Sequence, residues 1–275
     1  MSGPDQCTPR ALSRSGETRP RDGSVRRNWL EPGRVDTYLR RMPKRSPFRY
    51  FKTNPEIIRL AVMMYVRFPL SLRNVEDLLH ESGVDVSHET VRFWWNRFGP
   101  LFAAEIRKRR VSGPRSSQWR WHLDEVFVKI NGERHYLWRA VDHEGEVLES
   151  FVTKTRDKNA VLKFLKKCLK RHGRVEEVVT DCLRSYGAAL TDLGIRDRQE
   201  TGRWANNRAE NSHQPFRRRQ RAMLRFRRRR ILQKFASVHA SVYSHFNQER
   251  ALYSRQNFKA NRAATLAEWR GLFSA

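Results

Sequence analysis

Apolar positions in the first ordered-looking part of the chain recur every three or four residues, as they do in amphipathic helices. Ser71 is placed to cap a second helix and Ser87 a third, which we expect over Glu89–Phe98. Gly83 breaks the chain between them. This order of helix, glycine turn and capped helix predicts an all-α helix-turn-helix domain over 48–110. A plain three-helix bundle with aromatic residues as its core is the alternative.

After a Gly/Pro/Ser-rich linker at 111–118 the apolar period changes from helical to alternating. We expect strands at 120–130, 135–142 and 146–153, a helix at 159–171, a strand at 175–180 and a helix at 185–193. Asn131-Gly132 between the first two strands is a strong hairpin signal. With a closing helix, this order is that of an α/β RNase H-like catalytic core, which we expect over 119–228. A basic, helical C-terminal segment follows at 229–275.

Residues 1–47 are rich in Arg, Ser, Gly and Pro and have almost no apolar periodicity, which predicts a disordered basic arm. Met42 precedes the first ordered-looking segment, so it is an alternative start of the protein. The longest apolar stretch, Ile57–Val66, contains Arg59 and is far shorter than the roughly 20 residues that span a bilayer. No signal-type apolar segment follows the N-terminus. We therefore expect no membrane partner.

Charge narrows the class of partner. The 275 residues hold 56 Lys and Arg against 29 Asp and Glu, a net charge of +27. Such an excess favours nucleic acid first and anionic membrane second, with a merely soluble basic protein as the alternative. Cys7, Cys168 and Cys182 fit neither a disulfide framework nor a zinc pattern, so we expect ordinary residues in a reducing cytoplasm.

Three acids are candidates for a metal site in this basic chain. Asp124 lies within the first predicted strand, Asp181 ends a later one, and Glu210 precedes an arginine cluster. Strand alternation puts Asp124 on one face with Val126 and puts Glu125 on the other. A carboxylate among apolar neighbours is costly unless it is paired or binds a cation, which favours Asp124 over Glu125 as the ligand. In an RNase H-like sheet the first and fourth strands are neighbours, so Asp181 would end beside Asp124.

Carboxylates of this kind suit Mg²⁺, a hard ion that prefers oxygen ligands. Two ions about 3.5–4 Å apart activate an attacking oxygen and stabilise a leaving one, without a side-chain nucleophile. Because the chain holds 29 acids, spacing alone leaves this assignment open.

The segment 203–230 is rich in arginine, and Glu210 is its one acid. Arginine suits phosphate contacts, although a nonspecific basic patch is the alternative. Pro215 predicts a kink or a restart of the helix that carries Glu210. The candidate DNA-contacting residues are His88, Arg92 and Asn96 of the third helix, with Asn206, Asn207, Arg217, Arg218, Arg219 and Arg221 around the acid.

Three blocks resemble the bacterial DDE transposases of insertion-sequence family six: Trp121–Asp142, Thr180–Gly187 and Asn206–His213. The segment that begins Pro69-Leu-Ser-Leu-Arg-Asn is similar to that family's DNA-binding region. The likeness runs from about 48 to 250, and the three blocks occur in order.

The resemblance implies an RNase H-like core with Asp124, Asp181 and Glu210 as the catalytic, metal-binding triad and Arg217 as a basic residue two turns after the glutamate. It implies two Mg²⁺ ions, for which Mn²⁺ substitutes, and replicative, cointegrate-forming strand transfer on short terminal inverted repeats. The expected partners are double-stranded DNA and at least one further copy of the chain, in a bacterial cytoplasm near the nucleoid.

Two features depart from the family pattern: the segment between Asp181 and Glu210 is shorter than usual, and Pro215 interrupts the helix. A catalytically inactive, DNA-binding repressor copy and an RNase H-type nuclease are the alternatives to an active transposase.

Overall fold

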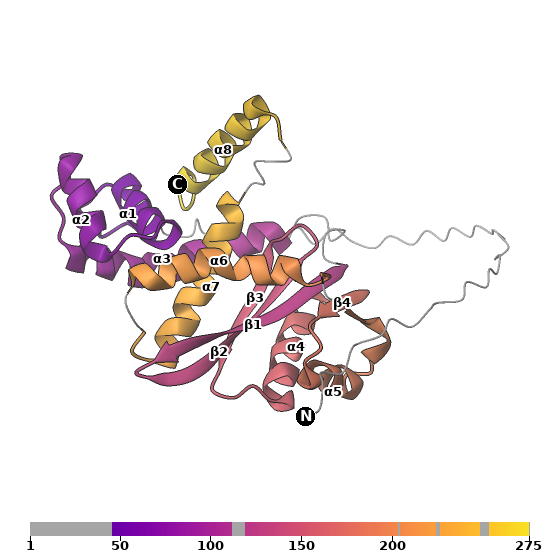
Figure 1. Cartoon of the computed structure of the whole chain (residues 1–275). Coiled ribbons are helices and arrows are strands. Elements are labelled where there is room, and N and C mark those ends of the chain that lie inside the picture. The colour runs from indigo at the N-terminus through magenta and orange to yellow at the C-terminus, as the bar shows by residue number, and fades with distance from the viewer. Residues whose placement is uncertain (1–45, 112–118, 203, 224–225, 248–252, 275) are drawn as a thin grey trace, which may run out of the picture.

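The computed structural model describes residues 46–111, 119–202, 204–223, 226–247 and 253–274. They form a mixed α/β protein in which helices cover both faces of a five-stranded sheet (Figure 1). The predicted arm up to residue 45, with Met42, and the predicted linker at 112–118 lie outside the described residues. None of the described helices is long and apolar enough to cross a membrane.

Three helices form the N-terminal part: α1 (Pro55–Arg67), α2 (Leu72–Glu81) and α3 (His88–Val111). The predicted caps are confirmed, because Ser71 and Asn74 form a capping box and the Ser87 hydroxyl accepts from the Thr90 N–H at 3.3 Å. The first and second predicted helices are confirmed with them.

The third predicted helix was too short, because α3 continues from Phe98 through Gly99 and Pro100 to Val111. A Cβ at Gly99 would lie 2.7 Å from the Trp95 ring, so the glycine serves close packing inside the helix rather than ending it. Beyond Pro100, burial of apolar side chains such as Phe102 stabilises the continued helix against the lost backbone hydrogen bond.

The sheet consists of β1 (Arg120–Ile130), β2 (Glu133–Asp142), β3 (Val147–Thr153), β4 (Glu177–Thr180) and β5 (Gln199–Thr201) in the order β3-β2-β1-β4-β5. β1, β2 and β3 are antiparallel, and β4 and β5 run parallel to β1. The predicted pairing of the first strand with the fourth is confirmed. Asn131 and Gly132 both have positive φ, 49° and 86°, as the predicted tight hairpin requires. Only the short β5 was not predicted.

The two faces of the sheet have separate cores. On one face Trp121 and Leu123 pack with residues of α4 (Lys158–His172) and α5 (Arg184–Asp192). On the other, Val126, Val128 and Ile130 pack with residues of α6 (Asn207–Ala222) and α7 (Arg229–Phe246). The alternation of β1 predicted this division.

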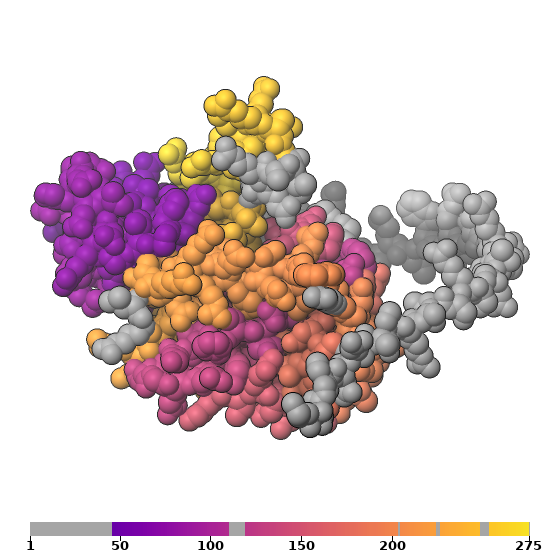
Figure 2. All heavy atoms as spheres, in the orientation of Figure 1, coloured from indigo at the N-terminus to yellow at the C-terminus, as the bar shows by residue number. Residues whose placement is uncertain are grey.

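The core under α6 and α7 continues into the helical domain, because it also holds buried residues of α1, α2 and α3. The buried Arg219 side chain of α6 donates from Nε to the Tyr65 carbonyl at 2.6 Å. The last helix, α8 (Arg255–Arg270), is joined to α1 by the Trp269 indole N–H, which donates to the Arg59 carbonyl at 3.2 Å. In Figure 2 the orange segment that includes α6 lies between the indigo-to-purple helical domain and the magenta strands.

Helix α7 is bound to the sheet by its Gln233 side chain, which accepts from the Val152 N–H and donates to the Ser150 carbonyl, both at 2.8 Å. The boundary drawn at 228 from the sequence thus falls between two helices that share one face of the sheet.

Candidate metal centre

The register between β1 and β4 sets the position of two acids. Trp121 lies opposite Val178 and His122 opposite Val179 in a parallel pair. Continued by two residues, this register brings Asp124 level with Asp181, which directly follows β4. Parallel neighbours therefore bring together two carboxylates that are far apart in sequence.

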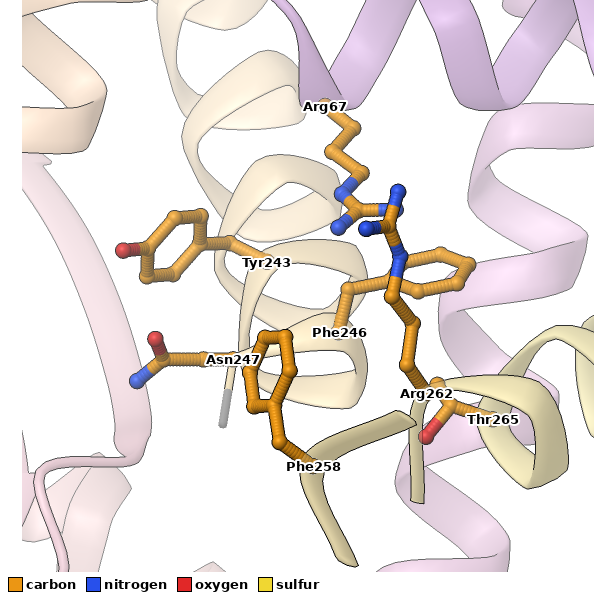
Figure 3. Close-up of a pocket in the computed structure, with 7 residues that line it drawn as sticks. All are labelled: Arg67, Tyr243, Phe246, Asn247, Phe258, Arg262 and Thr265. Carbon is orange, nitrogen blue, oxygen red and sulfur yellow. The ribbon is translucent and has the colours of Figure 1, made fainter. Parts of the chain in front are cut away.

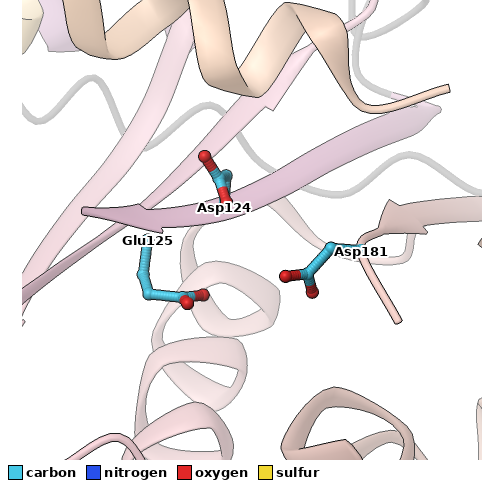
Figure 4. A group of neighbouring side chains, drawn as sticks. All are labelled: Asp124, Glu125 and Asp181. Atoms are coloured by element: carbon cyan, nitrogen blue, oxygen red, sulfur yellow. The ribbon is translucent and has the colours of Figure 1, made fainter. Parts of the chain in front are cut away.

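Among the described residues, Asp124, Glu125 and Asp181 form a group in which one carboxylate oxygen of each lies within 4.8 Å of the others. Figure 4 shows the Glu125 and Asp181 side chains turned toward each other on one side of β1, with Asp124 on the other side. Hard oxygen donors in this number are what Mg²⁺ or Mn²⁺ prefers. The donor set fits a divalent metal ion.

Glu125 is the most enclosed of the three carboxylates. Its Oε1 accepts from Arg156 Nε at 2.6 Å and its Oε2 from the Tyr186 hydroxyl at 2.9 Å. Burial raises the pKa of Glu125 to about 7, against the opposing effects of Arg156 and the Tyr186 hydrogen bond. Arg156 also lies 3.9 Å from Asp181, so a single guanidinium forms ion pairs with two of the three acids.

The strand-face argument put Asp124, rather than Glu125, on the apolar face of β1, and in the structure Glu125 is the more enclosed of the two carboxylates. The Glu125 side chain is 4% exposed and that of Asp124 is 17% exposed. The cause lies outside β1, because Tyr186 and Arg156 come from segments that follow much later in the chain and cover Glu125. Glu125 is thus a member of the acidic group that sequence reasoning set aside.

Asp181 is the most open of the three. Its Oδ1 accepts from the Leu183 N–H at 3.1 Å, which holds the carboxylate at the turn that follows β4. Burial, together with the nearby Asp124 charge, raises the pKa of Asp181, while the Leu183 N–H and Arg156 oppose this shift.

Helix α6 is attached to β1 beside Asp124. The Asn206 amide donates to the Leu123 carbonyl at 2.8 Å, and His213 Nε2 lies 3.0 Å from Asp124 Oδ2. Burial lowers the pKa of His213, so the ring is neutral at pH 7. These two contacts hold the first two turns of α6 along the strand.

Glu210 lies between these two contacts, at helical spacings of four from Asn206 and three from His213. Its side chain is exposed, and it does not belong to the group of three carboxylates. Helix α6 runs without interruption through Pro215, so the helix does not restart there. The buried Phe216 and Arg219 hold the second half of the helix against the core.

The candidates on α3 have partners within the protein. His88 Nδ1 lies 2.8 Å from Glu76, and Arg92 lies 2.7 Å from Glu89. Asn96 accepts from Lys234 Nζ at 3.0 Å. Arg92 and Asn96 remain exposed, whereas His88 is half-buried.

The candidates on and before α6 divide into two sets. Asn207, Arg218 and Arg221 are exposed, and the half-buried Arg217 places its guanidinium 5.4 Å from the centre of the Phe127 ring. Asn206 and Arg219 are buried, 5% and 1% exposed, and bond to backbone carbonyls.

We therefore set Asn206 and Arg219 aside as DNA contacts. The signal that sequence reasoning missed for Arg219 is its spacing of three from Phe216, which places it on the apolar face of α6.

Comparison with known proteins points to one class of protein. Residues 118–249 match the family model of a DDE domain (DDE_Tnp_IS240). The chain is 33% identical over 172 residues to the transposase for insertion sequence-like element IS431mec of Staphylococcus aureus, covering 60% of this chain and 75% of that protein. It is 32% identical, with the same coverage, to the transposase for insertion sequence element IS257 in transposon Tn4003 of the same species.

The protein is therefore a DDE-domain transposase. Within that class, the chain belongs to the bacterial insertion-sequence family six, IS6, which confirms the resemblance of the three sequence blocks. Among solved structures it is similar to the simian T-cell lymphotropic virus intasome in complex with PP2A regulatory subunit B56 gamma, with 14% identity and a TM-score of 0.35 over 54% of this chain and 58% of that one. That likeness is too slight to bear on the fold.

Proposed function

We propose that this transposase cleaves DNA at the ends of its element and joins the freed 3′-OH ends to target DNA, in a reaction that depends on a divalent metal ion. The observation that carries the proposal is the group of Asp124, Glu125 and Asp181 oxygens inside a matched DDE domain. Carboxylates at this spacing are the ligands that phosphoryl transfer by metal ions needs.

In this proposal Asp124 and Asp181 hold Mg²⁺, or Mn²⁺ in its place, and Glu210 of α6 completes the triad. When bound, two ions activate the attacking oxygen and stabilise the leaving one. The chain's own part is to hold the ligands: His213 orients Asp124, the Leu183 N–H orients Asp181, and Tyr186 with Arg156 fixes Glu125. Hydrogen-bond partners of this kind keep such ligands from turning away.

DNA would lie along the exposed basic side chains. The helical domain offers Arg92 and Asn96 of α3 to the terminal repeats as a helix-turn-helix, and α6 offers Arg218 and Arg221 to phosphates. Arginine–phosphate contacts release counterions, so affinity should fall steeply as salt rises. Replicative, cointegrate-type transposition requires two ends to be brought together, so the active form is at least a dimer.

The test is a joining assay with the element's own ends. The flanking DNA is inspected for short inverted repeats, and a labelled end is incubated with purified protein, target DNA and Mg²⁺ or Mn²⁺. We expect metal-dependent cleavage and joining, and we expect Asp124→Asn to bind the end without joining it. Binding without any cleavage would identify an inactive repressor copy, and hydrolysis without joining would identify a nuclease.

A further inference from the structure

A second site lies apart from the acidic group, in a pocket of about 260 Å³ where the ends of α1 and α7 meet α8 (Figure 3). Two arginines and three aromatic residues line it, together with Asn247 and Thr265. None of these residues belongs to the acidic group, to its partners or to the predicted DNA contacts.

The charge in this pocket is one-sided. Figure 3 shows the guanidinium groups of Arg67 and Arg262 side by side, and no Asp or Glu is among the described lining residues. Burial lowers the pKa of Arg67, and the like charge of Arg262 lowers it further. A bound anion would offset the repulsion between these two neighbouring cations. Each guanidinium is planar and presents several N–H donors, which suit phosphate oxygens.

Three aromatic rings form a second part of the pocket wall. Figure 3 shows the rings of Tyr243 and Phe258 to the left of the two guanidinium groups and the ring of Phe246 behind Arg262. The Tyr243 ring is held in place by stacking on the buried His239, with ring centres 5.6 Å apart and planes at 10°. Nucleobases stack on such rings without regard to sequence.

Asn247 supplies the third kind of group that a nucleotide needs. Its side-chain amide has both donor and acceptor atoms, which match the edge of a base. The volume of about 260 Å³ lies just below the range for ligand pockets, which starts at about 300 Å³, so the pocket suits one base and its phosphate rather than a DNA duplex.

We propose that this pocket binds one unpaired nucleotide of a DNA strand, with its phosphate on Arg67 and Arg262 and its base against Tyr243 and Phe258. The nucleotide must be unpaired, because stacked neighbours cover a base within a duplex and keep it from side-chain walls. The assignment rests on the proposed function in that the strand is the DNA being transposed.

Crosslinking tests the position of the base. A short 5′-phosphorylated oligothymidylate that carries 5-iodouracil is bound to the full chain and irradiated, and the crosslinked peptide is identified by mass spectrometry. We expect crosslinks at Tyr243 or Phe258. Crosslinks that map to other parts of the chain and spare both residues would overturn the proposal.

Matched variants test the contribution of the walls. Phe258→Ala should weaken binding of the oligothymidylate roughly tenfold through the lost stacking. Arg262→Gln should reduce the salt slope of binding by about 0.7. The controls are Tyr253→Ala, an exposed ring nearby, and Arg255→Gln, which removes the same charge from the same helix. Equal effects of the controls and the pocket variants would overturn the proposal.

Competition separates a nucleotide site from a bare anion site. Thymidine monophosphate should displace the oligothymidylate at lower concentration than inorganic phosphate does. Equal potency of the two competitors would contradict a contact between the base and the pocket. The joining assay distinguishes this proposal from the proposed function. If the chain joins DNA normally and the pocket variants have no effect, the nucleotide pocket is contradicted and the proposed function stands. If the chain joins no DNA but is crosslinked at Tyr243, the proposed function is contradicted and the nucleotide pocket stands.

Discussion

His213 places its Nε2 3.0 Å from Oδ2 of Asp124, so the helix that carries Glu210 is attached to the strand that carries the first acid of the site. Burial keeps the imidazole neutral, and the N–H of a neutral ring can donate a hydrogen bond to a carboxylate without adding a charge. The contact thus sets both the rotamer of Asp124 and the position of α6.

Removing this contact should affect both stability and joining. His213→Ala leaves a cavity and an unpaired carboxylate, and we expect a loss of about 1–3 kcal/mol in the free energy of unfolding. The rate of joining should fall by a larger factor than the affinity for the DNA end, because Asp124 is no longer held in place. Thermal unfolding and single-turnover joining measure the two effects. Gln214→Ala, an exposed neighbour on α6, is the control, and an equal loss in both variants would contradict the assigned contact.

Binding of a divalent ion should stabilise the folded chain. At a Mg²⁺ or Mn²⁺ concentration about 100 times the dissociation constant, the gain is about 2.7 kcal/mol. Asp181→Asn removes one ligand and should abolish the rise in Tm on titration with Mn²⁺. Asp192→Asn, an acid paired with Lys158 outside the group, should respond as the parent does. A Tm rise that survives in Asp181→Asn would show that the ion binds elsewhere.

The buried His239 should make the protein sensitive to acid. Burial, together with the nearby Arg139 and Arg219 charges, lowers the pKa of His239 far below its ordinary value. The unfolded chain therefore binds more protons, so stability is full above about pH 6.5 and falls as the pH drops below it.

His239→Phe removes this group among its aromatic neighbours and should flatten the acid side of a plot of Tm against pH. The slope of the free energy of unfolding against pH should differ between the parent and His239→Phe by at most about 1.4 kcal/mol per pH unit. The exposed His80→Ala variant is the control. Parallel curves for parent and His239→Phe would show that another group causes the acid sensitivity.

Of two arginines on α6, the buried Arg219 should contribute to stability and the exposed Arg221 to DNA binding. Arg219→Gln leaves the buried Tyr65 carbonyl without its donor and should cost about 1–3 kcal/mol of stability. Arg221→Gln is exposed and should leave stability unchanged while lowering the salt slope of duplex binding by about 0.9. Chemical denaturation and salt-dependent fluorescence anisotropy test the pair. If Arg221→Gln keeps the parent slope, α6 does not line the DNA.

The sequence pattern was sufficient wherever a signal was local. Alternation predicted β1 with the bounds that it has in the structure, and Asn131-Gly132 predicted the hairpin that follows it. The expected adjacency of the first and fourth strands is present, and it brings Asp181 to Asp124. Caps at Ser71 and Ser87 were likewise predicted, because a cap depends on residues within one turn.

The features that escaped prediction depend on residues far apart in the chain. Glu125 is enclosed by Tyr186 and Arg156, which no inspection of β1 alone reveals. Helix α3 passes Pro100 because the far half of the helix packs on α7. The position of Glu210 is likewise set by tertiary contacts, since Asn206 and His213 hold α6 along β1 while Glu210 stays outside the group of three carboxylates.

The core that joins the N-terminal helices to the sheet has a further consequence. Segments that share a large apolar interface do not swing independently of each other. Under the proposed function, the dimensions of the protein would therefore set the number of base pairs between the sequence that the helical domain binds and the phosphate that is attacked at the acidic group. An element whose ends carried extra base pairs in that interval would have to bend or unwind its DNA, because the core that the described helices and strands share does not stretch to absorb them.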